Sequence, residues 1–193
     1  QGDLARYAEL YKEAQVKDWK SAQEYYLHAL ELLPNNGNPH NQLAVIATYQ
    51  NDECEAIYRY FRSLAVSTPF VSAKENLTLL FEKNRQTYEQ SVEPHLKQRK
   101  KSRNATTEED YAVTEKRFLS EFIRLHGILF TRISMEKMPV IQSEALKDFE
   151  FLLMKGADHL DALMLKLTIM IIFTLENSRK LQSPVLQPNS AST

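Results

Sequence analysis

Apolar residues recur three and four positions apart along most of the chain, and this spacing predicts helices. The first two predicted helices cover residues 4–15 and about residues 18–33, and we expect them to pair antiparallel. The apolar stripe on the second helix consists of Trp19, Ala22, Tyr26, Ala29 and Leu33. The sequence PNNGNP follows this stripe and predicts a turn, because its prolines and glycine interrupt a helix.

Further helices are predicted downstream. A helical hairpin is expected over residues 38–70, with its turn at Asn51-Asp52, and a longer helix over residues 71–92. Helical spacing returns at Tyr111, and again over residues 139–154 and 158–178. The last of these helices is apolar on almost every side near its middle, so we expect it to be buried at the centre of the fold. Four glycines and no alternating strand pattern make the expected class all-α.

A fixed interval relates the first two hairpins. Ala22 and Tyr26 recur 34 residues later as Ala56 and Tyr60. This period and residue order are typical of a tetratricopeptide repeat, in which small residues let two helices close and an aromatic ring fills the groove. We therefore predict a tetratricopeptide-like helical hairpin array that forms an α-α superhelix. The alternative is an ordinary packed α-hairpin, which also uses Ala and Tyr at helical spacing.

The composition divides the chain into four parts. The hairpin array is expected over residues 1–92, and a second helical-hairpin segment over residues 113–180. Between them, residues 93–112 form a charged linker in which a basic block precedes an acidic one. Residues 181–193 are rich in proline and small polar residues, and we expect them to be disordered.

Composition also excludes several classes of function. The chain has 24 basic and 25 acidic residues, so its net charge does not mark it as a nucleic-acid binder. A single cysteine rules out an internal disulfide framework and a cysteine-rich zinc site. The longest apolar run, residues 163–175, is too short to span a bilayer. The sequence shows no paired histidine motif and no glycine-rich phosphate loop, so we expect no enzyme, no metal site, no cofactor and no membrane partner.

One candidate for recognition is the pair Arg6-Tyr7 near the first helix start. An arginine can hold a phosphate through two parallel charge-assisted hydrogen bonds, and a neighbouring tyrosine hydroxyl can add a third donor. The alternative is a structural arginine that forms a salt bridge with Asp3 or Glu9. Sequence alone leaves both interpretations open.

A second candidate is the basic block in the linker. It places five cations within seven residues: Lys97, Arg99, Lys100, Lys101 and Arg103. Such a block can neutralise nucleic-acid phosphates, but it lacks aromatic residues on which bases could stack. A solvated linker or a nuclear import signal would have the same composition.

Several blocks together carry a resemblance to a known family. They are GDLARY, AQEYYLHALELLPNNGNPHNQLAVIATY, AIYRYFRSLAVSTPF, FEKNRQ and FIRLHGILFTRIS, and they cover about residues 2–178. In this order they resemble the SMG family of nonsense-mediated decay adaptors, members five, six and seven, and the telomerase-associated Ever Shorter Telomeres protein of yeast. GDLARY also resembles the phosphoserine-gripping stretch of the 14-3-3 proteins.

The resemblance implies a 14-3-3-like domain of tetratricopeptide-type hairpins, followed by the start of a helical-hairpin domain. It also implies that Arg6 contacts a phosphate, that Tyr7 lies beside it, and that Asn41 contacts the peptide backbone. In the family, a further basic residue of this pocket comes from an earlier helix, which would precede residue 1 of this chain. The family is also described as having a DNA- and RNA-binding segment.

The function that the resemblance implies is that of an adaptor fragment in nonsense-mediated mRNA decay. Its expected partners are the phosphorylated Upf helicase and other SMG-family members or decay factors. The alternative is a telomerase-associated module that binds telomerase RNA or telomeric DNA. We expect a cytoplasmic location with shuttling to the nucleus.

Overall fold

The computed structural model describes residues 1–94, 111–156 and 160–182. The α-helices are α1 (Gly2–Tyr11), α2 (Lys20–Leu32), α3 (Gly37–Tyr49), α4 (Glu53–Ala65), α5 (Ala73–Thr87), α7 (Tyr111–Thr131), α8 (Met138–Lys155) and α9 (Leu160–Gln182). A π-helix, η1 (Tyr88–Val92), follows α5, and a short 3-10 helix, η2 (Met135–Lys137), precedes α8. Within these ranges, extended pairing is limited to one isolated bridge between Asn36 and Thr68, so the predicted all-α class is confirmed.

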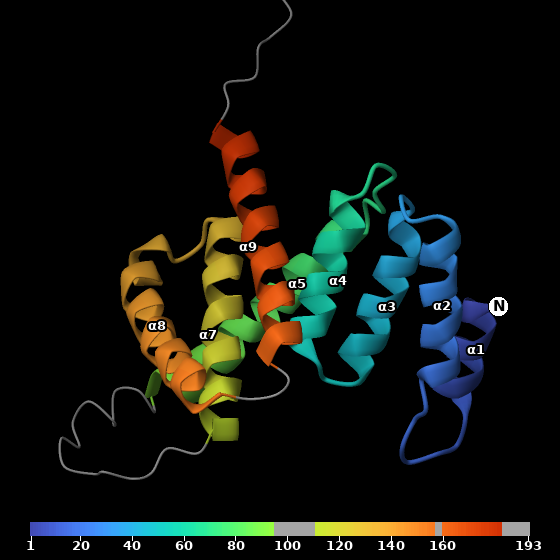
Figure 1. Ribbon diagram of the computed structural model, residues 1–193, viewed down its shortest axis with the longest axis horizontal. Helices are drawn as coiled ribbons and strands as arrows, with labels where there is room; N and C mark the ends of the chain where they lie inside the picture. Colours follow the sequence, from blue (N-terminus) through green and yellow to red (C-terminus); the bar gives the residue numbers. More distant parts are fainter. Residues whose placement is uncertain (95–110, 157–159, 183–193) are drawn as a thin grey trace, which may run out of the picture.

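The first five helices form the predicted hairpin array. Each of α1 to α4 packs against the helix that follows it, and the α3–α4 pair has the most extensive contact. In Figure 1 the array runs from the N-terminus at one end toward the centre of the molecule. Helices α7 and α8 pair at the opposite end, where α7 packs on α5, and α9 lies against both α4 and α7.

The 34-residue interval corresponds to equivalent positions in the hairpins. Ala22 and Tyr26 are buried on α2, and Ala56 and Tyr60 are buried on α4, which is the second helix of the next hairpin. Small residues at these contacts let the paired helices approach closely. The predicted helix over residues 18–33 is therefore confirmed, with its ends shortened to those of α2.

The turn between α2 and α3 is fixed by contact with the end of α4. The Gly37 amide donates to the carbonyl of Thr68 at 2.9 Å, and the Ser63 hydroxyl donates to the carbonyl of Gly37 at 2.8 Å. A Cβ atom on Gly37 would lie 2.4 Å from the carbonyl oxygen of Ser63, so no side chain fits there. Tertiary contact thus requires the glycine in PNNGNP.

A large core cluster joins the hairpin array to the C-terminal helices. Phe61 of α4 is completely buried, and its ring is stacked at 4.3 Å from the ring of Phe173 on α9. Between α7 and α8, Arg117 Nη2 donates to Asp148 Oδ1 at 2.6 Å, and both side chains are buried. The core therefore continues from the array into the C-terminal helices.

The helix predicted over residues 71–92 is present, but its geometry changes near its end. Beyond α5, the amide of Glu93 donates to the carbonyl of Tyr88, which is the hydrogen-bond spacing of a π-helix. Tyr88 itself is buried and packs with Ile128 of α7 and Ile141 of α8. The wide turn thus lies where three helices meet.

The prediction for the last helix was right about its position and wrong about its burial, because α9 packs against both α4 and α7 but is not buried on every side. Leu167 and Met170 of α9 are buried, but Leu165, Ile172 and Leu175 are 63%, 56% and 62% exposed. Helix α9 therefore has one apolar face in the core and another that faces outward. The sequence pattern failed because an apolar run predicts burial without identifying what would cover each face.

The predicted division into four parts stays a prediction. Most of the charged linker, at residues 95–110, and residues 183–193 of the predicted tail lie outside the described ranges. Helix α7 begins at Tyr111, and α9 continues to Gln182.

Candidate phosphate-binding site

The start of α1 is organised around Tyr26 of α2. The Tyr26 hydroxyl donates to Asp3 Oδ1 at 2.7 Å and accepts a hydrogen bond from Arg6 Nε at 3.3 Å. Gly2 allows this approach, because a Cβ atom there would lie 2.7 Å from the Tyr26 ring. Three positions of the GDLARY block therefore converge on one side chain.

Arg6 is 7% exposed, and its charge is balanced locally. Its Nη2 lies 3.6 Å from Asp3 Oδ1, and its guanidinium lies 4.3 Å from the centre of the Tyr7 ring. Burial lowers the pKa of Arg6, but hydrogen bonds to Tyr26 and Tyr7 raise it by more, so the net pKa is above its ordinary value. Arg6 therefore keeps its charge at any physiological pH.

Tyr26 keeps its proton as well. Burial, followed by the hydrogen bond to Asp3, raises the pKa of Tyr26 to about 12. The neutral hydroxyl can then donate to Asp3 and accept from Arg6 at the same time. The ion pair with Asp3 that the sequence suggested is thus present, as part of a network that fixes the direction of Arg6.

Tyr7 presents an accessible ring beside Arg6. It is 47% exposed, and its ring stacks on that of Tyr11 with the centroids 6.4 Å apart. Arg6 and Tyr7 therefore combine a fixed cation with an exposed hydroxyl-bearing ring on one helix. Their predicted contact with a phosphate stays a prediction.

Asn41 lies elsewhere in the array. It is buried on α3, and its Oδ1 accepts a hydrogen bond from Asn76 Nδ2 of α5 at 3.3 Å. No hydrogen bond among the described residues joins Asn41 to Arg6 directly. Sequence reasoning missed Asn76; the available signal was a polar residue directly before the buried Leu77 of α5.

The basic block of Lys97, Arg99, Lys100, Lys101 and Arg103 lies outside the described residues. Its predicted contact with nucleic acid stays a prediction.

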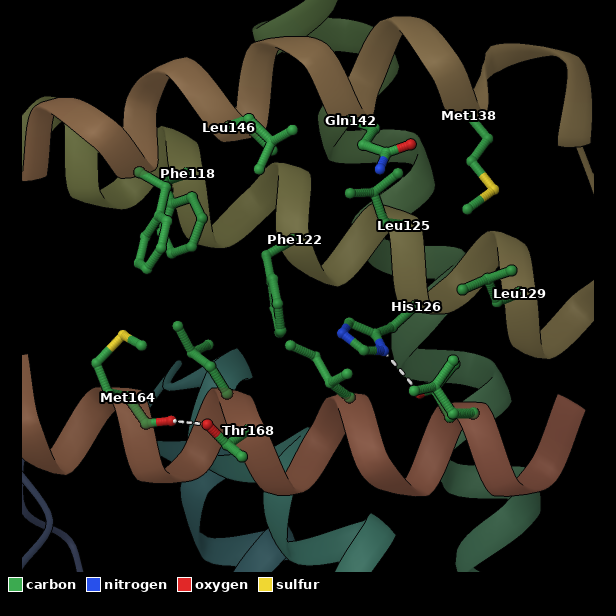
Figure 2. A pocket seen from close by; sticks show the side chains of 16 residues that line it. Phe118, Phe122, Leu125, His126, Leu129, Met138, Gln142, Leu146, Met164 and Thr168 are labelled. Carbon is green, nitrogen blue, oxygen red and sulfur yellow. Dashed lines mark hydrogen bonds between the residues drawn. The ribbon is translucent and has the colours of Figure 1, made fainter. Parts of the chain in front are cut away.

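An apolar groove of about 340 Å³ lies among α7, α8 and α9. Figure 2 shows Phe122 and His126 of α7 in the space between the other two helices. His126 Nδ1 lies 2.6 Å from Thr174 Oγ1 of α9, and burial lowers the pKa of His126 to about 4. The groove's lining contains no lysine or arginine among the described residues, so it offers no cation to a phosphate.

Other kinds of site find no support in the described ranges. No three His, Cys, Asp or Glu side chains come together there as a metal site would require. None of the helices described is both long and apolar enough to cross a bilayer. Cys54 is buried on α4, and burial raises the pKa of its thiol to about 12, which keeps it protonated and unreactive.

Comparison with known proteins identifies the family. Residues 22–191 match the family model described as the Est1 DNA/RNA binding domain. The chain belongs to the Est1 family. Tyr26 and Asn41 lie within the matched range, and Arg6 and Tyr7 lie ahead of it.

Individual relatives are decay factors and a telomerase-binding protein. The nonsense-mediated mRNA decay factor SMG7 of Arabidopsis thaliana is 37% identical across 93% of this chain and 20% of its own length. The telomerase-binding protein EST1A of Danio rerio is 31% identical across 93% of this chain and 14% of its own length. An SMG7-like decay factor of Arabidopsis thaliana is 54% identical across 47% of this chain and 10% of its own length. The Est1-family chain thus spans a fifth or less of each relative, and the resemblance found from the sequence blocks is confirmed.

Proposed function

We propose that this chain is an adaptor fragment in nonsense-mediated mRNA decay that binds the phosphorylated Upf helicase through a phosphoserine at Arg6. The assignment to this process is supported by relatives that are named as decay factors. The observation that carries the binding role is the fixed cation: Arg6 is held by Tyr26 and Asp3, beside the exposed ring of Tyr7. Recognition of a phosphopeptide is a binding function and requires no catalytic step.

The chemistry of the arginine fits this role. A guanidinium carries five N–H donors, and Nε of Arg6 already donates to Tyr26. The two Nη nitrogens carry the other four N–H groups. Nη2 also lies 3.6 Å from Asp3 Oδ1, so a phosphate would share the guanidinium with this carboxylate while it accepts two parallel bonds. Because Tyr26 fixes the guanidinium beforehand, binding costs less side-chain entropy than it would for a free surface arginine.

The two amides of the array could serve the peptide backbone. Asn41 and Asn76 each carry two N–H donors and a carbonyl acceptor. Their mutual hydrogen bond uses one donor of Asn76 and the carbonyl oxygen of Asn41. The remaining groups can pair with the main-chain amides of a bound peptide. Asn41→Ala is therefore expected to weaken the binding of the phosphorylated and the plain peptide by the same factor. A change at Arg6 should weaken the binding of the phosphorylated peptide more.

Titration calorimetry with a phosphoserine peptide of the Upf helicase and its unphosphorylated twin tests the proposal, using this chain and the full-length protein. Losing a charge-assisted hydrogen bond costs about 1.5–3 kcal/mol, so Arg6→Ala should weaken phosphopeptide binding by roughly 10- to 100-fold. Arg6→Glu should weaken it further, because it places two negative charges together. Tyr7→Phe should reduce the affinity for the phosphopeptide by less than Arg6→Ala does.

Lys20→Ala is the matched control, because Lys20 is an exposed cation on α2. It should bind the phosphopeptide as the parent does. Each variant should keep the helical circular dichroism of the parent. Equal affinity for the two peptides, or normal binding by a folded Arg6→Glu protein, would reject the phosphopeptide role.

A second candidate is a nucleic-acid module that serves telomerase, with telomerase RNA or telomeric DNA as its ligand. The description of the matched family model and the relative named as telomerase-binding favour it. The basic block at residues 97–103 is the sequence feature that could supply the phosphate contacts.

We propose a cytoplasmic location with nuclear shuttling, which fluorescence microscopy of the tagged full-length protein would test.

Salt dependence separates the two candidates. Nucleic-acid binding through five cations should show a logarithmic salt slope of roughly −3.5 to −4.5, and deletion of residues 97–103 should remove it. A flat salt dependence, or full RNA affinity after the deletion, would exclude this block as the site.

A further inference from the structure

A cleft of about 540 Å³ lies at the junction between the hairpin array and α9. It is bounded by the C-terminal end of α4, the start of α5, the end of α7 and the C-terminal half of α9. Helices α4 and α9, which both line it, pack against each other. We call this feature the junction cleft, and it is separate from the Arg6 site, whose residues do not line it.

The junction cleft has three cations around it. Arg62 comes from the last turn of α4, Lys74 from the first turn of α5, and Lys180 from the last turn of α9. None of these cations forms an ion pair within the described part of the chain. The acidic residue on the lining, Glu176, is already paired with Arg179 at 2.9 Å. The cleft therefore carries excess positive charge contributed by three separate helices.

The floor of the junction cleft is apolar and mainly aliphatic at its surface. Ile172 is 56% exposed, whereas Phe61 is completely buried. The ring of Phe173 is stacked against Phe61 at 4.3 Å, and that of Phe130 lies 6.5 Å from Phe61. The aromatic rings are thus occupied by one another, and the aliphatic Ile172 is the large apolar side chain that a ligand would meet first.

These features distinguish between two classes of ligand. A single nucleic-acid strand needs open aromatic faces on which its bases stack, and the rings here pack against each other. A peptide that carries carboxylates and aliphatic side chains matches both the charge and the floor. Amphipathic helices bind such grooves with their apolar face inward and their charged positions at the rim.

We propose that the junction cleft binds an acidic amphipathic segment of a partner protein. Leucine-type side chains of the segment pack on Ile172, and its carboxylates pair with Arg62, Lys74 and Lys180. A chain that binds a phosphoserine at Arg6 would then have a second, independent point of attachment for protein partners. This proposal does not depend on the phosphate site.

The probe for the test is a fluorescein-labelled 12-residue peptide with leucines at helical spacing, at positions 1, 4, 5, 8 and 12, and glutamates elsewhere. Fluorescence anisotropy with the whole chain should show saturable binding. A twin with lysine in place of each glutamate should bind at least tenfold more weakly, because it meets like charge at the rim. A labelled 12-nucleotide oligouridine serves as the nucleic-acid arm.

Charge reversals locate the site. Three charge reversals should each weaken binding of the acidic peptide by about three- to tenfold, since each replaces an attraction with a repulsion. They are Lys74→Glu, Lys180→Glu and Arg62→Glu. Ile172→Ser should weaken it by a similar factor through loss of apolar contact. Lys20→Glu on α2 is the matched control and should leave the affinity unchanged. Because Arg62 is half-buried, Arg62→Gln provides a milder second variant.

Three results would overturn the proposal. They are equal binding of the lysine twin, tighter binding of oligouridine that the acidic peptide cannot displace, and unchanged affinity in the three folded charge-reversal variants. Arg6→Ala should bind the acidic peptide normally, so failure of the phosphate site and failure of the junction cleft are distinguishable.

Discussion

At the residue scale, Tyr26 determines the geometry of a site to which it contributes no charge. Its hydroxyl links Asp3 and Arg6, and its ring fills the space that Gly2 leaves open. Removing only the hydroxyl would leave the ring packing intact but would leave Arg6 Nε without its acceptor. Tyr26 is therefore a positioning residue for the guanidinium.

The first prediction is that Tyr26→Phe lowers the free energy of unfolding by about 1–2 kcal/mol, the cost of leaving a buried donor unsatisfied. Urea denaturation measures this change. Tyr25→Phe is the matched control, since the neighbouring Tyr25 is 43% exposed, and it should stay within about 0.5 kcal/mol of the parent. Equal effects of the two variants would contradict the proposed role of the Tyr26 hydroxyl.

The second prediction concerns pH. Burial lowers the pKa of His126 from 6.5 to about 4, so the unfolded chain binds more protons than the folded chain between these values. The stabilisation is complete above pH 6.5 and is lost as the pH falls toward 4, with a loss of roughly 2 kcal/mol from this residue at pH 5. Burial, followed by Arg59 and Arg62, lowers the pKa of His40 to about 4 as well, which adds a loss of the same sign.

Urea denaturation at pH 7 and pH 5 checks this loss. His126→Asn keeps a hydrogen-bonding group near Thr174 but cannot titrate, so its stability should change less between the two values. A variant with the same pH dependence as the parent would show that His126 does not titrate as inferred.

The sequence predicted only part of the candidate site. Arg6 and Tyr7 could be named because adjacent residues of a short motif stay adjacent in the fold. Tyr26 and Asn76 could not, because their contacts with Arg6 and Asn41 span 20 and 35 positions along the chain. Such contacts depend on how far each helix is rotated about its axis, and only tertiary packing sets that rotation.

At the scale of elements, helix positions followed closely from apolar spacing, whereas helix environments did not. The small Ala56 of α4 is completely buried, as the 34-residue interval required. In α9, by contrast, Leu165 and Ile172 are largely exposed although the pattern predicted a buried helix. Periodicity predicts which residues form a helix, but the burial of each helix face depends on neighbouring helices that the pattern does not specify.

The third prediction tests the helix contact at Ala56. Ala56→Leu should overpack the contact beneath α4 and cost about 1–3 kcal/mol of unfolding free energy, which thermal denaturation would register as a lower Tm. Ala162→Leu is the control, because Ala162 is exposed on α9. An unchanged Tm for Ala56→Leu would argue against the repeat-type contact.

At the scale of the whole molecule, a buried ion pair joins α7 to α8. Arg117 and Asp148 are 8% and 6% exposed and meet through two hydrogen bonds. A buried charge without its partner carries a large desolvation penalty. The pairing of the two helices therefore depends on both residues together.

The fourth prediction is that Asp148→Ala lowers the free energy of unfolding by roughly 3–5 kcal/mol, because it removes the carboxylate that accepts two hydrogen bonds from the buried guanidinium of Arg117. Lys147→Ala breaks the nearby Lys147–Glu144 pair from its exposed side and should cost less, about 1 kcal/mol or below. Urea denaturation compares the two. A second comparison is Arg117→Leu combined with Asp148→Leu, which should recover most of the loss. Equal losses for Asp148→Ala and the double variant would contradict this account.

The wide turn at Tyr88–Val92 has a consequence for how this family can vary in length. A π-helical turn holds one residue more than an α-helical turn, so the segment stores a single surplus position. Deleting one residue there would let the turn revert to α-helical geometry while the flanking residues keep their orientation. The same deletion inside α4 or α7 would rotate every later side chain by about 100°. Natural one-residue length differences among related chains should therefore accumulate at this turn and be absent from the neighbouring helices.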